Sequence, residues 1–197
     1  MNAKTFAPGS RPGLDAAETA LCEDMAGYLA GRIDSFDALY DALAQRLRSY
    51  LLALCRDASV ADDLLQDTFL QVHRARHTYQ PGRPVTPWAF AIARHVFLMH
   101  QRRTARRLRL GTELSAQAIH ERSSHSNAAG ATVDGVVVRR ALSRVPQAQR
   151  NAVVLHHVYG WSFADIAATL GIQVNAARLR AFRGLKRMRD IVGAPSR

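Results

Sequence analysis

The sequence contains few aromatic residues, two cysteines and no long run of uncharged apolar residues. Cys22 and Cys55 lie far apart and form no CxxC pair, which indicates free thiols in a reducing compartment, each acting as a small apolar group in a helix. The most apolar stretch, residues 87–99, contains Arg94 and His95. We therefore expect no membrane span and a cytoplasmic protein, and no signal peptide is visible.

Acidic residues are also scarce, with 16 Asp and Glu against 27 Lys and Arg, so the formal net charge is +11. Such an excess favours a polyanionic partner, because each Lys or Arg placed on a phosphate releases a condensed counterion. A soluble protein with an arginine-rich surface would carry the same charge. The charge alone therefore leaves both interpretations open.

Strand patterns are absent as well, and apolar residues at spacings of three and four predict helices along most of the chain. The first helix is expected to begin at Ser35, a good N-cap residue, and the second to cover about 59–76. A loop with three prolines follows at 79–87, where Thr86 is expected to cap a helix over 88–107.

A change of composition then divides the chain in two. Residues 111–135 are rich in Ser, Thr and Gly and predict a flexible linker, with a short helix near 116–121. The sequence therefore predicts an all-α protein of two small helical domains joined by this linker, the second a helix-turn-helix domain. The expected boundaries are an N-terminal extension over 1–27, a first domain over 28–110, the linker over 111–135 and a second domain over 136–193.

The most informative stretch is residues 161–189. Ser162 is expected to cap a short helix and Gly171 to form a tight turn before a basic helix over about 174–192, which together make a helix-turn-helix. One side of the last helix carries small and apolar residues that allow close approach to the short helix before it: Ala177, Ala181, Gly184, Leu185 and Met188.

The other side of the last helix is basic, and no acid occurs between residues 176 and 189. Arginine can donate two hydrogen bonds to guanine in the major groove, and apolar side chains can touch a thymine methyl group. We predict that this side binds DNA. An arginine-rich amphipathic helix docked on a partner protein is the alternative interpretation.

Residues 61–69 (ADDLLQDTF) form an acidic, polar segment in an otherwise basic chain. Asp62, Asp63, Gln66 and Asp67 share roughly one side of the predicted helix, and the helix dipole favours acids near its start. A docking surface for a basic or polar partner is one interpretation. Simple solubilisation of the helix is the other.

An acid-free arginine run follows the loop, with Trp88, Phe90 and Phe97 before and within it. Aromatic rings can stack on the bases of an unwound strand while arginines bind its backbone. The alternative places Trp88 and Phe97 in the hydrophobic core. The arginines of the run are Arg94, Arg102, Arg103, Arg106, Arg107 and Arg109.

These motifs and their order resemble sigma factors of the extracytoplasmic-function group, over about residues 28–192. The segments that carry the resemblance are ADDLLQDTF at 61–69, PWAFAIARH at 87–95 with Arg102 and Arg103, LSRVP at 142–146 with Gln149 and Arg150, and WSFADIA at 161–167. The resemblance implies a non-enzymatic factor, without cofactor or metal, that binds core RNA polymerase and promoter DNA and is held inactive by an anti-sigma factor.

The resemblance also implies a role for each surface. The residues that would dock on the clamp helices of the polymerase β′ subunit are Asp62, Asp63, Leu65, Gln66, Asp67 and Phe69. Those that would recognise the −10 element and promote its melting, together with the loop at 79–87, are Trp88, Arg94, His95, Arg102 and Arg103. Those that would read the −35 element are Arg178, Leu179, Phe182, Arg183 and Lys186.

Two other classes of protein compete with this interpretation. A helix-turn-helix regulator that acts alone carries a receiver or ligand-binding domain, and the sequence has no β/α pattern to build one. A metal-dependent enzyme could use His73 and His77, spaced by one helical turn, but no third ligand is evident. His156 and His157 point in two directions and cannot chelate from one face.

Overall fold

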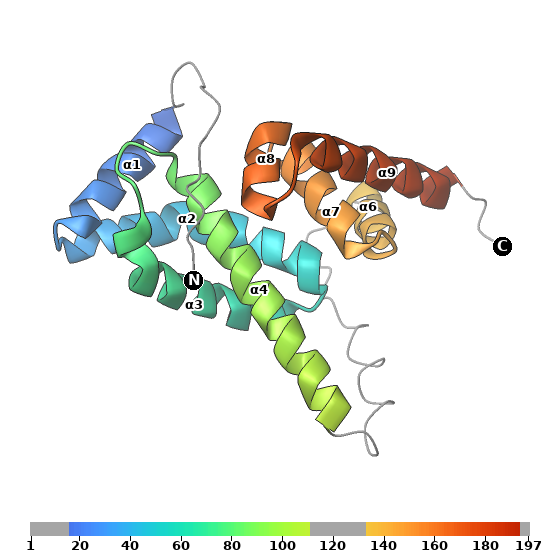
Figure 1. Ribbon diagram of the computed structural model, residues 1–197, viewed down its shortest axis with the longest axis horizontal. Coiled ribbons are helices and arrows are strands. Elements are labelled where there is room, and N and C mark those ends of the chain that lie inside the picture. The colour runs from blue at the N-terminus through green and yellow to red at the C-terminus, as the bar shows by residue number, and fades with distance from the viewer. Residues whose placement is uncertain (1–15, 111–132, 194–197) are drawn as a thin grey trace. The chain divides into compact units, whose positions relative to one another are not determined.

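Two helical units make up the part of the chain that the computed structural model describes, residues 16–110 and 133–193 (Figure 1). No strand occurs in these two ranges, which confirms the predicted all-α class with two helical domains. None of the helices within them has the length and hydrophobicity that crossing a bilayer requires. The linker predicted at 111–135, with its short helix at 116–121, lies almost entirely outside the described residues.

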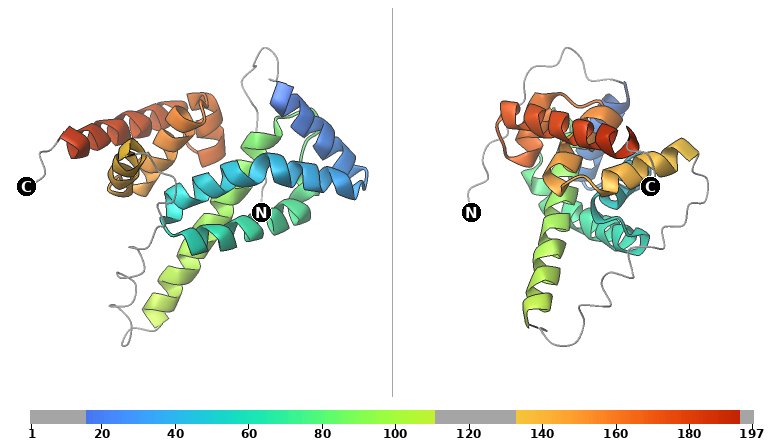
Figure 2. Two further views of the ribbon diagram at one scale, coloured as in Figure 1. Left: turned by 180° about the vertical axis from the view of Figure 1, so that it is seen from behind. Right: turned by 90° about the vertical axis from the view of Figure 1, so that its right-hand side faces the viewer.

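The first unit is built around a central helix, as Figure 2 shows. Its elements are α1 (Ala16–Leu29), α2 (Ile33–Cys55), α3 (Ala58–Ala75), a short 3-10 turn η1 (Arg76–Thr78) and α4 (Val85–Leu110). Helix α2 packs against α1, α3 and α4, and a row of leucines spaced by three and four residues provides its buried side. These leucines are Leu39, Leu43, Leu47, Leu51 and Leu54.

Helix α1 was not anticipated as part of this unit, since the sequence predicted an N-terminal extension over 1–27. Leu21 and Met25 of α1 are buried, and α1 packs against both α2 and α4. The predicted boundary between residues 27 and 28 therefore falls inside a helix.

Two of the predicted helix starts in this unit are wrong. Helix α2 begins at Ile33, so Ser35 is a buried residue of its first turn and caps nothing. Helix α4 begins at Val85, which is fully buried, and the hydroxyl of Thr86 has no hydrogen-bond partner. The Thr86 backbone N–H instead donates to the Glu18 carboxylate of α1, at 2.8 Å. A side chain from a distant helix thus accepts the hydrogen bond of a backbone N–H group that has no partner within α4.

The second unit contains the predicted helix-turn-helix. Its elements are α6 (Val133–Ser143), α7 (Gln147–Val153), a π-helical segment η3 (Val154–Val158), α8 (Phe163–Leu170) and α9 (Val174–Gly193). Ser162 caps α8 by accepting a hydrogen bond from the Asp165 N–H at 3.2 Å. Gly171 ends α8 with φ of +64°, a conformation that glycine adopts without strain. Both predictions are confirmed.

A buried arginine fastens the start of this unit. The Arg150 side chain of α7 is 4% exposed and donates to the backbone carbonyls of Leu142 (2.8 Å), Ser143 (3.2 Å) and Val145 (2.8 Å). Leu142 and Ser143 end α6, where backbone carbonyls have no partner within the helix and the dipole favours a cation. Arg150 therefore joins α6, the following turn and α7.

The last helix packs against α8, as predicted, but Gly184 on its small side faces another neighbour. Ala177, Ala181 and Gly184 are buried, as expected. A Cβ on Gly184, however, would lie 2.5 Å from Cγ2 of Val153 and 3.3 Å from the carbonyl oxygen of Gln149, and both residues belong to α7. Glycine at 184 thus allows α9 to approach α7, whereas the sequence predicted close approach to the short helix α8.

Candidate polymerase- and DNA-binding surfaces

The exposed side of α3 carries the predicted acidic surface. Asp63, Gln66 and Asp67 are all exposed, and their spacing places them on one side of the helix. Leu70 lies on the same side, one turn further on, and is 56% exposed. We define these four residues as the α3 face. Its apolar member escaped the sequence analysis, although its spacing from Gln66 and Asp67 could have revealed it.

Asp62 belongs to the flank of the α3 face and has an internal partner. Its carboxylate accepts two hydrogen bonds from the Arg48 guanidinium of α2, at 2.5 and 3.1 Å. The hydrogen bond from Arg48 holds the pKa of Asp62 below its usual value. Neither Asp63 nor Asp67 has an ion pair in the described part of the chain, so their charges are free to meet a partner.

Leu65 and Phe69, predicted to touch the polymerase, lie in the core of the first unit. They are 7% and 5% exposed, and the Phe69 ring packs against Tyr40 of α2 with centroids 4.5 Å apart. In this position they anchor α3 and orient its outer side. Direct contact of Leu65 and Phe69 with the polymerase stays a prediction. The α3 face, as defined by its four exposed residues, does not include them.

A second exposed stripe runs along α4. Residues spaced by four and three share one side of the helix, and each is half-buried or exposed. The stripe consists of Trp88, Ile92, His95, Met99, Arg102 and Arg106, with Arg103 beside it. Four of the five residues predicted for the −10 element are thus brought together; Ile92, Met99 and Arg106 are additions.

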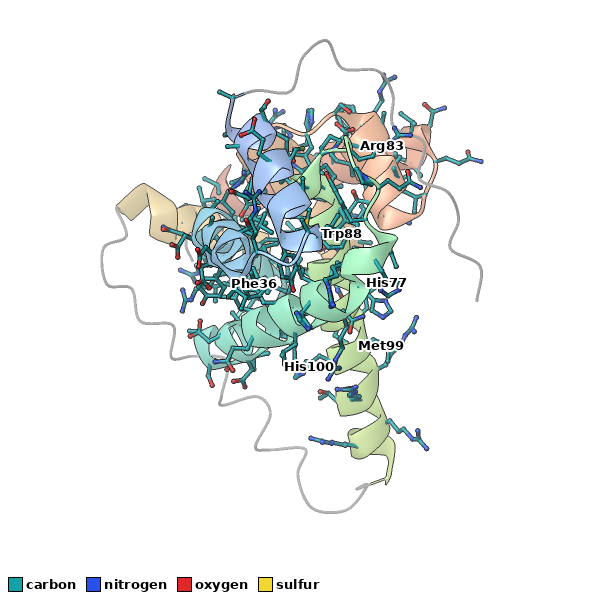
Figure 3. All side chains as sticks on the ribbon, turned by 90° about the vertical axis from the view of Figure 1, so that its left-hand side faces the viewer. Phe36, His77, Arg83, Trp88, Met99 and His100 are labelled. Atoms are coloured by element: carbon teal, nitrogen blue, oxygen red, sulfur yellow. The ribbon has the colours of Figure 1, made fainter. Side chains whose placement is uncertain are left out.

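Arg94, the fifth predicted residue, points elsewhere. It follows Ala93, which is fully buried, and is itself only half-exposed on a different side of α4 from His95. Figure 3 labels Trp88 and Met99 on the stripe, with His100 further round the same helix. A direct role for Arg94 at the DNA has no support from its placement.

The aromatic residues of α4 divide into core and surface. Phe90 and Phe97 are 0% and 1% exposed, so the idea that they stack on bases is wrong, and the core interpretation of Phe97 is confirmed. Trp88 is half-buried and makes an edge-on contact with Tyr79, with ring centroids 5.4 Å apart. Only Trp88 keeps a ring surface that a base could reach.

The last turns of α4 extend beyond the helices that pack against its first half (Figures 1 and 2). Every residue from 101 to 107 is exposed, including Arg102, Arg103, Arg106 and Arg107. A helical segment that buries no side of itself and carries only positive charge is suited to bind along a phosphate backbone.

The outer side of α9 presents the five residues predicted for duplex DNA. All are exposed: Arg178, Leu179, Phe182, Arg183 and Lys186. Phe182 is 66% exposed and Leu179 46%, which leaves both available to thymine methyl groups. The Arg178 guanidinium lies 5.7 Å from the centre of the Phe163 ring of α8, a cation–π contact that restrains it at the start of the basic side.

Within the described residues, the structure does not bring the histidines considered for a metal site together with further ligands. Nδ1 of His73 hydrogen-bonds the Tyr28 hydroxyl of α1, and His77 lies beyond the end of α3, in the 3-10 turn. His156 stacks on Phe163 and shares a hydrogen bond with the Trp161 carbonyl at 2.8 Å. Among residues 16–110 and 133–193, no three His, Cys, Asp or Glu side chains gather as a metal site would require.

Taken together, the surfaces define a helical protein of two units with an exposed acidic face on α3 and exposed basic sides on α4 and α9. Comparison with known proteins specifies it further. The Sigma-70 region 2 family matches residues 39–107, and Sigma-70 region 4 matches residues 136–188.

Curated relatives span nearly the whole chain. The RNA polymerase sigma factor CarQ of Myxococcus xanthus is 36% identical over 176 residues, which is 86% of this chain and 95% of that protein. The sigma factor EcfG of Rhodopseudomonas palustris is 29% identical over 155 residues, 77% of this chain and 83% of that protein. The chain therefore belongs to the extracytoplasmic-function group of the sigma-70 family, whose general role is promoter-directed initiation of transcription.

Solved structures share the fold. The sigma factor RpoE of Bartonella quintana, crystallised with the anti-sigma factor NepR, matches with a TM-score of 0.71 at 21% identity, covering 83% of this chain and all of that one. CnrH, in complex with the cytosolic domain of CnrY, matches with a TM-score of 0.65 at 22% identity, covering 91% of this chain and 99% of that one.

Proposed function

We propose that this sigma factor divides its task among three surfaces. The α3 face fastens the first unit to core polymerase, the α4 stripe with the preceding loop engages the −10 element, and the outer side of α9 reads the −35 element. The observation that carries the proposal is the separation of charge. The exposed acids of α3 are unpaired within the described residues, whereas α4 presents arginine without any acid and α9 has no acid before Asp190, near its end.

The α3 face has the chemistry of a docking surface for a basic or polar partner helix. Asp63 and Asp67 supply negative charge, and Leu70, one turn beyond Gln66, supplies an apolar contact beside them. The charges steer the two proteins together and fix how the helices align, while burial of the leucine side chain on binding removes apolar surface from water. The β′ clamp helices of the polymerase, which the family resemblance implies, are the partner we assign to it.

The two DNA surfaces suit two forms of DNA. The α9 side can enter the major groove of duplex DNA, where Arg183 donates to guanine and Lys186 meets phosphate. The α4 stripe combines one accessible ring, Trp88, with arginines, which suits a single strand whose bases are unstacked. Melting then traps opened DNA at a cost of a few kcal/mol per unstacked step, and this chain performs no covalent step.

A separate anti-sigma protein is the partner we propose for the inactive state. The structural neighbour RpoE was solved with such a protein, and the surfaces that we assign to polymerase and DNA are exposed in this chain. A sigma factor sequestered in this way acts in the same compartment as the polymerase, which supports the cytoplasmic location.

The test of the proposal is the assembly of holoenzyme with charge-reversed variants. Asp63→Lys combined with Asp67→Lys is expected to abolish measurable binding to core polymerase, because each reversal replaces an attraction by a repulsion worth about 2 kcal/mol or more. Glu23→Lys, which changes an exposed acid of α1, is the matched control and should bind like the parent. Unchanged binding of the double variant, with its helical content intact, would refute the docking assignment.

A further inference from the structure

The loop between η1 and α4, residues 79–84, is held in place by α1, a helix that the chain forms more than fifty residues earlier. Three groups make the connection. Cys22 of α1 hydrogen-bonds the loop, and Tyr79 of the loop donates to the Cys22 sulfur. Glu18 of α1 hydrogen-bonds Thr86, directly after the loop at the start of α4. Because Glu18 and Cys22 are spaced by one helical turn, they lie on the same side of α1.

Glu18 caps α4 from outside the helix. Its Oε1 accepts the backbone N–H of Thr86 at 2.8 Å, and Thr86 is the second residue of α4. The first four N–H groups of a helix have no partner within it, and a negative charge at this end is favourable. The Thr86 hydroxyl is buried without a hydrogen bond, so it does not supply this cap itself.

Cys22 and Tyr79 meet at one backbone carbonyl. The Cys22 thiol donates to the oxygen of Arg83 at 3.4 Å, and the Tyr79 hydroxyl donates to the same oxygen. Tyr79 is 6% exposed, and burial raises the pKa of its hydroxyl well above the usual value, so the group keeps its proton and remains a donor. The Arg83 carbonyl is thereby hydrogen-bonded both to α1, through Cys22, and to the first residue of the loop, Tyr79.

The same tyrosine contacts the accessible indole of the α4 stripe, Trp88. Tyr79 and Trp88 lie edge to face with centroids 5.4 Å apart. A displacement of the loop would therefore move Tyr79 and, with it, the packing of Trp88. The chain of contacts runs from α1 through the loop to the ring that the proposed function places at the −10 element.

The polar contacts of α1 with the loop and with Thr86 are separate from the apolar contacts that hold α1 to the unit. Leu21 and Met25 are 4% and 0% exposed and provide the apolar contact of α1 with its neighbours. Glu18 is only half-buried. A change at Glu18 can thus release the loop while the apolar side of α1 stays packed.

We propose that Glu18 and Cys22 are positioning residues, which hold residues 79–86 and Trp88 in the arrangement that selects the bases of the −10 element. The proposal rests on the proposed function, because it presumes that this loop meets the promoter strand. It gives α1, a helix to which the proposed function assigns no DNA contact, an influence on which promoters are used.

The experiment uses holoenzyme assembled from core polymerase and the full chain. Run-off transcription is measured on a promoter and on a set of templates with single substitutions in its −10 element. Glu18→Ala removes the cap, Glu18→Gln retains an oxygen acceptor at the same place, and Cys22→Ala removes the thiol donor. Glu23→Ala, at an exposed acid of the same helix, is the matched control.

We expect Glu18→Ala to reduce the discrimination between the best and the substituted −10 elements by roughly fivefold, the ratio that corresponds to the loss of one helix cap. Cys22→Ala should reduce it by a smaller factor. Glu18→Gln should keep most of the discrimination, and Glu23→Ala all of it. Binding to core polymerase and dependence on the −35 element should be unchanged in every variant.

Parent-like discrimination by a folded Glu18→Ala protein would overturn the proposal, as would an equal loss in Glu18→Ala and Glu23→Ala. Failure of the proposed function looks different. In that case the parent holoenzyme itself would be insensitive to the −10 substitutions, and both inferences would fall together.

Discussion

The two units differ in how they position the helix that is to meet DNA. Helix α9 is placed by neighbours in sequence: Ser162 caps α8, Gly171 turns the chain, and α9 follows at once. Helix α4 is placed by a residue 68 positions earlier, because Glu18 caps its start. The helix-turn-helix is therefore a local device, whereas the α4 stripe depends on the assembly of its whole unit.

This difference has a physical consequence for tolerance to change. Local caps and turns act within a few residues, so each contributes its own increment of about 1 kcal/mol. Contacts between distant segments are formed only when the unit has folded, and losing one can alter a surface without unfolding the chain. Four substitutions examine this contrast.

The largest expected effect is at Arg150. Arg150→Leu leaves three backbone carbonyls, two at the end of α6 and one in the following turn, without their buried donor, which should destabilise the second unit by roughly 3 kcal/mol or more. Amide hydrogen exchange should show lost protection in residues 133–193 and unchanged protection in 16–110. Arg140→Leu, at an exposed position of α6, is the control. Loss of protection in both units would mean that they do not fold independently.

Gly184→Ala tests the approach of α9 to α7. The new methyl group would lie 2.5 Å from Cγ2 of Val153, so we expect a loss of about 1–3 kcal/mol in the stability of the second unit, measured by thermal unfolding. Gly193→Ala adds its methyl group in open space and should stay within about 0.5 kcal/mol of the parent. Equal effects at the two glycines would contradict the close packing.

Arg183→Ala tests whether a residue on the outer side of α9 acts in DNA recognition without contributing to stability. The side chain is exposed, so stability should be unchanged, while transcription from promoters that depend on the −35 element should weaken by roughly 1–3 kcal/mol in apparent binding. Arg144→Ala removes an exposed arginine from the same unit and serves as the control. An unaltered promoter profile for Arg183→Ala would remove this residue from the DNA-binding side.

The smallest effect concerns the ion pair between Arg48 and Asp62. Because Arg48 depresses the pKa of Asp62 in the folded state, the pair stabilises the first unit above the ordinary aspartate pKa, and this contribution disappears as pH falls through the depressed value. Both side chains are nearly half-exposed, so the contribution is below about 1 kcal/mol. Arg48→Gln should raise the Asp62 pKa in an NMR titration; an unshifted pKa would show that the pair is absent in solution.

Sequence reasoning succeeded where the determining residues are neighbours. The cap at Ser162, the turn at Gly171 and the small residues facing inward on α9 follow from local patterns, and the structure confirms them. The acidic side of α3 was equally visible, since exposure follows from helical spacing alone.

Sequence reasoning failed where segments that are distant in the chain contact each other. The sequence gives no sign that Glu18 caps α4, because a glutamate in a separate helix looks like any exposed acid. Gly184 was assigned to the wrong neighbour for the same reason, as periodicity identifies the buried side of a helix but not the helix that covers it. Phe90 illustrates the remaining error, an aromatic residue beside arginines that belongs to the core.

The central claim is that this chain brings two DNA-binding units to core polymerase and thereby selects promoters. Its most direct test is transcription of fragmented genomic DNA by core polymerase with and without the chain, with the 5′ ends of the transcripts mapped. The account predicts new start sites that appear only with the chain and share two upstream sequence elements at a constant spacing. A chain that binds core polymerase yet adds no start sites, or adds sites without a shared pair of elements, would contradict it.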